Sequence, residues 1–106
     1  MAKFLWKAAY SSDGVKGLLK EGGTGRRAAI DKLTEALGGK VEAFYYALGE
    51  EDVIVIVDLP DNTTAAAISL AVNAIGAVQL KTVPLLTVEE VDEAAKKSVD
   101  YRPPGG

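Results

Sequence analysis

Three polar side chains, Lys7, Glu42 and Tyr46, stand among apolar neighbours in segments that alternate as β-strands do. An amine, a carboxylate and a phenol can move a proton or hold the polar part of a ligand. The alternative is that their polar tips reach water at the edge of a subunit contact. We name all three as candidate ligand-binding residues. No nucleophile with an adjacent base can be assembled from the chain, so we predict no catalytic residue.

A second candidate site lies where Arg26 and Arg27 follow the glycine-rich residues 23–25. The spacing matches the G-x-G-x-x-A pattern of dinucleotide-binding turns, but that pattern must follow a strand and open the next helix directly. Here a short predicted helix intervenes. Backbone amides and two arginines at a helix N-terminus can still bind an anion. The alternative is structural, with Thr24 capping the helix and Arg27 paired with Asp31.

Three neighbouring carboxylates, Glu50, Glu51 and Asp52, precede the most apolar segment of the chain. Crowded carboxylates attract a divalent cation, although a solvated acidic turn is the commoner outcome. The chain has no cysteine and no histidine. This excludes disulfides, thiolate nucleophiles, the usual zinc ligands and an imidazole base. We therefore expect neither a metal site nor a cofactor.

Composition and charge narrow the possible partners. Hydrophobic residues make up 48% of the chain and charged residues 25%, which is typical of a globular protein. The 12 basic side chains are outnumbered by 15 acidic ones, so the chain lacks the basic surface used to bind nucleic acid. No apolar stretch is long enough for a membrane span or a signal peptide. We expect a cytoplasmic protein that binds neither nucleic acid nor membrane.

Apolar spacing and turn residues predict the elements that position these side chains. We expect strands at residues 4–10, 40–48, 53–59 and 77–83, and helices at 15–21, 24–37, 62–73 and 88–97. Residues 49–52 form a hairpin turn, Asn62 caps a helix, and Thr87 and Glu90 have the spacing of a capping box. The βαββαβ order predicts an α+β ferredoxin-like sandwich, a four-stranded antiparallel sheet with helices on one face plus a C-terminal helix. We expect one domain over residues 1–100 and a flexible tail over 101–106.

Residues 53–57, Val-Ile-Val-Ile-Val, have no polar face, although helices cover only one side of the sheet in this fold. Further apolar residues are predicted on the same open face as Lys7 and Glu42: Leu5, Ala9, Phe44, Tyr46 and Leu48. Such a face is typical of a subunit contact, so we expect a homo-oligomer formed through the open sheet face. The second helix, nearly free of charge, is a further candidate contact; alternatively, the helix at 88–97 packs back over it.

Several stretches together form a specific combination: residues 3–6, 17–23, 26–27, 38–40, 42–45, 57–61, 71–73, 81–82 and 84–87. With them the chain resembles the GYD domain family of small bacterial and archaeal proteins. The family is named after a Gly-x-Tyr-Asp turn, to which residues 49–52 correspond, and Glu51 stands where the tyrosine is expected. The resemblance implies the ferredoxin-like fold and no established activity.

Three functions are compatible with these residues. The first is a non-enzymatic homo-oligomer that binds a small molecule at a sheet face or subunit seam. The second is a cofactor-free enzyme similar to the dimeric α+β barrel oxygenases and isomerases, with Lys7, Glu42 and Tyr46 transferring protons. The third is a trimer similar in assembly to the PII signalling proteins, with an anionic effector near Arg26 and Arg27. We take the first as the working hypothesis.

Overall fold

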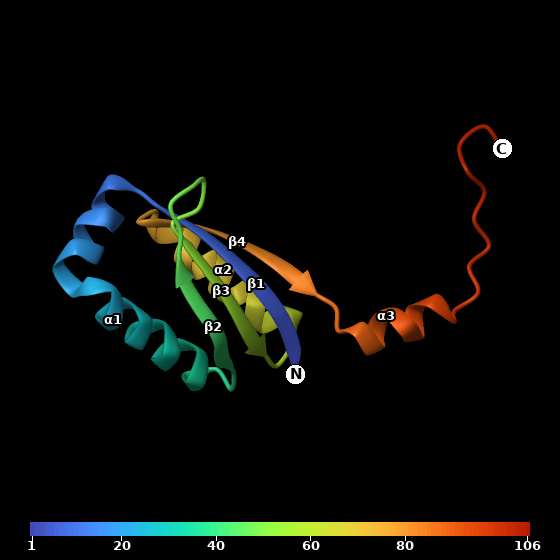
Figure 1. Cartoon of the computed structure of the whole chain (residues 1–106), viewed down its shortest axis with the longest axis horizontal. Helices are drawn as coiled ribbons and strands as arrows, with labels where there is room; N and C mark the ends of the chain where they lie inside the picture. Colours follow the sequence, from blue (N-terminus) through green and yellow to red (C-terminus); the bar gives the residue numbers. More distant parts are fainter.

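The computed structural model describes the whole chain, residues 1–106, as one sheet with three helices (Figure 1). In chain order the elements are β1 (Ala2–Tyr10), α1 (Ser12–Ala36), β2 (Lys40–Tyr46), β3 (Val53–Leu59), α2 (Asn62–Ile75), β4 (Val78–Leu85) and α3 (Val88–Ala95). This confirms the predicted βαββαβ order followed by a last helix. None of the helices combines the length and apolar composition needed to cross a bilayer.

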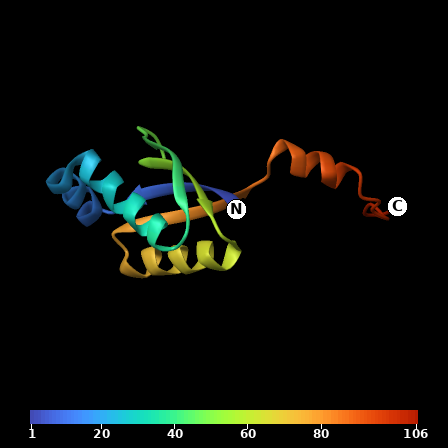
Figure 2. The ribbon, with the colours of Figure 1, turned by 90° about the horizontal axis from the view of Figure 1, so that it is seen from below.

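The sheet has the strand order β2-β3-β1-β4, and every neighbouring pair is antiparallel. In the two central registers, Trp6 of β1 lies opposite Val55 of β3 and Thr82 of β4. Side chains of α1 and α2 pack on the same face of this sheet, and Figure 2 shows α2 running beneath the strands. The arrangement is the predicted ferredoxin-like sandwich.

The core consists of strand residues that face the helices together with two residues of α2. Its buried hydrophobic members are Phe4, Trp6, Ala8, Phe44, Val53, Val55, Val57, Leu59, Ala65, Ile68 and Leu80. Because side chains alternate along a strand, Ile54 and Ile56 of β3 point to the open face of the sheet. The interpretation of residues 53–57 as a strand with two apolar faces is confirmed.

α1 begins earlier than predicted and runs through the glycines. Ser11 caps it, since its hydroxyl accepts a hydrogen bond from the Gly14 N–H at 3.1 Å. Gly22, with φ 77° and ψ 165°, is not helical and forms a kink between two helical segments, as the predicted interruption at residues 22–23 requires; other residues rarely adopt this conformation. The two predicted helices are therefore two halves of one kinked element, and Thr24 lies inside the second half, not at its cap.

β2 contains a bulge that reverses a predicted face. Its register against β3 shifts between Val41 and Ala43, and Glu42 is the extra residue. Beyond the bulge, Phe44 and Tyr46 lie opposite residues of β3 that face the helices. The prediction that Phe44 and Tyr46 lie on the open face was wrong, because one added residue moves every later side chain to the other side.

Asp61, not Asn62, caps α2. Its Oδ1 accepts a hydrogen bond from the Thr64 N–H at 2.8 Å, and this bond holds the pKa of the Asp61 carboxyl below its usual value. At the other end, Gly76 adopts the left-handed conformation, φ 86°, that commonly ends helices. β4 then continues two residues further than predicted, to Leu85.

α3 begins with the predicted capping box. The Thr87 N–H donates to Glu90 Oε1 at 2.9 Å, and the Glu90 N–H donates to Thr87 Oγ1 at 3.1 Å. The helix then extends away from the sheet (Figures 1 and 2). It does not pack over α2, so the interpretation in which it covers that helix was wrong.

Candidate functional site

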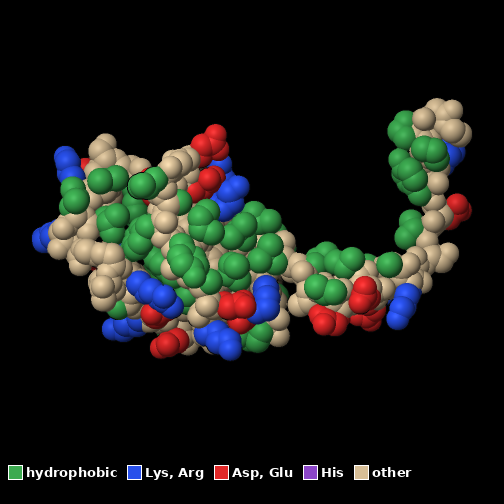
Figure 3. Space-filling model, viewed as in Figure 1, with side chains coloured by type: hydrophobic (Ala, Val, Ile, Leu, Met, Phe, Trp, Pro, Cys, Tyr) green, Lys and Arg blue, Asp and Glu red, His purple; other side chains and the backbone are tan.

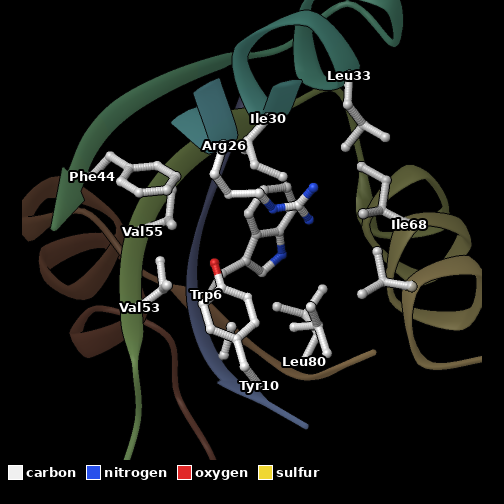
Figure 4. A pocket seen from close by; sticks show the side chains of 13 residues that line it. Trp6, Tyr10, Arg26, Ile30, Leu33, Phe44, Val53, Val55, Ile68 and Leu80 are labelled. Atoms are coloured by element: carbon white, nitrogen blue, oxygen red, sulfur yellow. The ribbon is translucent and has the colours of Figure 1, made fainter. Parts of the chain in front are cut away.

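A cavity opens between α1 and α2, over the middle of the sheet. α1 lies mainly along β2, whereas α2 lies along β4 and β3, so that neither helix covers the centre alone. The cavity has a volume of about 50 Å³, and 12 of its 13 lining side chains are hydrophobic. The strands supply its floor and the helices its walls, with Trp6, Val53, Val55, Ile30, Leu33 and Ile68 among them (Figure 4). Sites for drug-sized ligands have volumes of about 300 Å³ or more, so this apolar space alone admits only a small part of such a molecule.

Trp6 lies at the centre of this cavity, between Phe44 on one side and Ile68 on the other (Figure 4). The residue is only 3% exposed, and its indole Nε1–H has no hydrogen-bond partner. Buried indole N–H groups usually have a partner, and leaving such a donor unpaired costs about 1 to 3 kcal/mol. The core beside the cavity thus contains one polar donor that the fold itself does not use.

Tyr10 and Arg26 form the polar rim of the cavity. Both also line a larger outer hollow of about 530 Å³ along the first half of α1, so the two spaces adjoin. Arg26 points from α1 into the cavity (Figure 4). Burial raises the pKa of the Tyr10 phenol, the nearby Arg26 guanidinium opposes this, and Asp52 and Glu21 add to it. At neutral pH the phenol keeps its proton, and Tyr10 and Arg26 are both hydrogen-bond donors.

Arg27 and Tyr46 line a separate hollow of about 390 Å³. The Tyr46 hydroxyl donates to the carbonyl oxygen of Gly23 at 2.9 Å. The Arg27 guanidinium carbon lies 5.7 Å from the centroid of the Phe44 ring, and Arg27 Nε lies 3.6 Å from Asp31 Oδ2. The predicted Arg27–Asp31 pair is confirmed. The two neighbouring arginines therefore face different hollows and do not converge on one anion position.

Lys7 and Glu42 lie on the open face as predicted, but in different ion pairs. Lys7 Nζ lies 3.7 Å from Glu51 Oε1. Glu42 Oε2 accepts from Lys3 Nζ at 2.7 Å, and Lys3 also donates to Oδ1 of the buried Asp58 at 2.9 Å. Hydrogen bonds from these two carboxylates, Glu42 first, raise the pKa of Lys3. The three polar residues expected to share one face are thus not a single site.

The acidic turn between β2 and β3 is tied into the sheet. Asp52 Oδ2 accepts from the Tyr10 N–H at 2.8 Å, and the Asp52 N–H donates to the Ala8 carbonyl at 2.8 Å. Leu48, predicted on the open strand face, instead lies exposed in this loop. Nowhere in the chain do three or more acidic side chains gather in a way that could hold a metal ion.

The sequence analysis named Arg26 as a candidate but not Trp6 or Tyr10. The available signal was the strand alternation, which puts Phe4, Trp6, Ala8 and Tyr10 on one face. Trp6 also belongs to the hydrophobic core. The missing hydrogen bond depends on which atoms the helices bring near the indole, and no sequence pattern encodes this.

Tyr10 and Tyr46 should ionise at higher pH than a free phenol, because burial raises the pKa of both. A raised pKa favours the neutral form in the folded state, so its stabilising effect is full below the unfolded value of about 10 and is lost as pH rises through the folded pKa. Alkaline titrations followed by tyrosinate absorbance should lose a late step in Tyr10→Phe and in Tyr46→Phe. Loss of an early step in either variant would contradict the assignment.

The chain matches the family model of the GYD domain over residues 4–95, from β1 to the last residue of α3. No curated protein and no solved structure shows significant similarity to it. The family match spans well over half of the chain and agrees with the resemblance found in the sequence. The protein is therefore a member of the GYD domain family.

Proposed function

We propose that this protein binds a small, mainly apolar molecule in the cavity between α1, α2 and the sheet, and that it does so without catalysis. The observation that carries the proposal is the unpartnered Nε1–H of Trp6, buried in an otherwise apolar enclosure. A ligand oxygen can accept a hydrogen bond from this N–H. The bond removes the free-energy cost of leaving the donor unpaired. The rest of the ligand contacts the aliphatic side chains.

The rim supports a ligand longer than the cavity itself. Tyr10, Arg26 and Val78 line both the inner cavity and the outer hollow, so a molecule can extend from one space into the other. Its inner end meets hydrophobic side chains and one donor, and its outer part meets a phenol and a guanidinium. We therefore favour aromatic or branched aliphatic compounds that carry a carbonyl or carboxyl group.

The residues that line the cavity support catalysis less well than they support binding. The polar side chains of the cavity lining are those of Tyr10 and Arg26, and burial raises the pKa of the Tyr10 phenol, which keeps its proton at neutral pH. A general base must lie within hydrogen-bond reach of the proton it takes, and the lining offers no carboxylate or amine. The separate hollows of Arg26 and Arg27 likewise give a two-arginine effector site less support.

The test uses the fact that Trp6 is the only tryptophan in the chain. Its indole N–H gives a single cross-peak in a ¹H–¹⁵N spectrum, which can be followed while benzaldehyde or toluene is added. The two probes are similar in size, and only benzaldehyde carries an acceptor. We expect benzaldehyde to shift the indole peak and to bind about fivefold more tightly than toluene, the equivalent of about 1 kcal/mol.

Trp6→Phe provides the matched variant, because it keeps an aromatic ring and removes the donor. The variant should bind both probes with similar affinity, while circular dichroism confirms that the fold is kept. An indole peak that neither probe moves at millimolar concentration would refute the site. A benzaldehyde preference that survives in Trp6→Phe would refute the role of the indole.

A further inference from the structure

The chain carries an arm, residues 86–101, whose large apolar side chains are exposed. Val88 is 75% exposed, Val91 51%, Val99 79% and Tyr101 70%. In Figure 3 the hydrophobic side chains of α3 gather along one side of the helix and the acidic ones along the other. Isolated helices of eight residues are marginal in water, so an amphipathic helix of this length needs a surface to pack on.

The arm does not reach the open face of its own sheet. β4 ends at Leu85 and Thr87 already caps α3, so Leu86 is the one residue between strand and helix. Reversing the chain takes a turn of about four residues, and the capping box holds Thr87 and Glu90 in place. α3 consequently continues away from the sheet in both views (Figures 1 and 2).

The open face of the sheet is the second uncovered apolar surface of the chain. Leu5 lies in register with Ile56 on one side and with Val83 on the other, so that β1, β3 and β4 contribute to one patch. Figure 3 shows this patch as hydrophobic side chains gathered over the sheet, with charged groups at its borders. Helices cover only the opposite face.

Each of the two surfaces carries charged side chains without a partner. Glu89, Asp92 and Glu93 of α3 form no ion pair within the chain. Lys81 on the open face is also unpaired and lies opposite Lys7 in the register of β4 with β1. The acidic side of α3 can therefore pair with the free amine of Lys81, while Lys3 and Lys7 of the open face already pair with carboxylates of their own chain.

We infer that two copies of this chain form a two-fold dimer in which the arm of each lies on the open sheet face of the other. A two-fold contact is reciprocal, so a single arrangement covers both arms and both faces. The arm leaves from the edge strand β4, which places it beside the face that it covers in the partner. The cavity of Trp6 lies on the opposite side of the sheet and plays no part in this contact.

Light scattering after size-exclusion chromatography tests the assembly at micromolar concentration. The full chain should have twice the mass of its 11.1 kDa protomer. Val91→Asp on the arm and Val83→Lys on the open face should each raise the dimer dissociation constant about tenfold or more, since charge replaces a buried apolar contact. Both positions are exposed in the single chain, so the fold should be kept, which circular dichroism checks.

Leu70→Asp on α2 is the matched control, because Leu70 is also exposed, at 73%, and lies on a different surface. It should leave the dimer intact. Photo-crosslinking from benzoylphenylalanine at position 91, in mixed ¹⁴N and ¹⁵N protein, should join the arm of one chain to β1 or β4 of another. A monomeric wild type, a dimer lost only in Leu70→Asp, or crosslinks to α2 would each overturn the inference.

Discussion

Leu59→Ala should lower the free energy of unfolding by about 3 to 5 kcal/mol, the range for a leucine removed from a closed core. Leu59 ends β3 and has no exposed surface. It lies opposite Ala2 of β1, and its Cδ2 approaches the backbone of Gly39. Backbone surrounds the side chain on two sides and cannot collapse into the space left by the substitution. The transfer free energy of the removed atoms and the cost of the remaining cavity therefore add. A loss of this size is a large part of the stability of a small domain.

Urea unfolding at one fixed protomer concentration measures this effect, since association also shifts apparent stability. Leu19→Ala is the matched control, because it is the same substitution on α1 at a side chain that is 80% exposed. The control should stay within about 0.5 kcal/mol of wild type. Equal losses in the two variants, or a loss below 1 kcal/mol for Leu59→Ala, would show that β3 does not end in the core.

Local sequence patterns predicted the helices and strands well where each pattern was compatible with only one structure. β3 begins and ends at the predicted residues, and the capping box of Thr87 and Glu90 forms as predicted. The face of β2 was predicted wrongly, because alternation is counted from one end and the bulge at Glu42 adds a residue that leaves no mark in the apolar pattern. The turn residues before Val15 were mistaken for a loop, since serine suits a turn and a helix cap equally well.

The candidate site was predicted only in part, for a different reason. Arg26 was identified from its type and position, and it does reach the cavity. Of the groups expected to meet on the open face, Lys7 and Glu42 form separate ion pairs, and the bulge in β2 moves Tyr46 to the other face. Such pairing depends on distances between residues far apart in the chain. The indole of Trp6 is a candidate because its N–H has no hydrogen-bond partner. Only the packed structure shows that such a partner is absent.

Gly39→Ala should lower the free energy of unfolding by about 2 to 3 kcal/mol, the usual cost of forcing an atom into a packed site. An added Cβ would overlap the carbonyl oxygen of Asp58 and lie 2.9 Å from Leu59 Cδ2. The backbone has little room to yield, because the Gly39 N–H is hydrogen-bonded to the Thr34 carbonyl at 2.8 Å. The glycine is thus held between the end of α1 and the end of β3, and either the β2–β3 pairing or the helix terminus must move.

Gly17→Ala is the same substitution at another position, but it should raise the free energy of unfolding. Gly17 lies in α1, and an added Cβ there has nothing within 4 Å. Alanine stabilises a helix interior relative to glycine by about 0.5 to 1 kcal/mol, because it restricts the unfolded chain. In urea denaturation, the free energy of unfolding should therefore be higher than that of wild type for Gly17→Ala and lower for Gly39→Ala. If Gly39→Ala were as stable as wild type, the contact between Gly39 and the end of β3 would not constrain the fold, and the packing of α1 against β2 would have to be looser than the distances indicate. A Gly17→Ala variant less stable than wild type would contradict the open surroundings of Gly17.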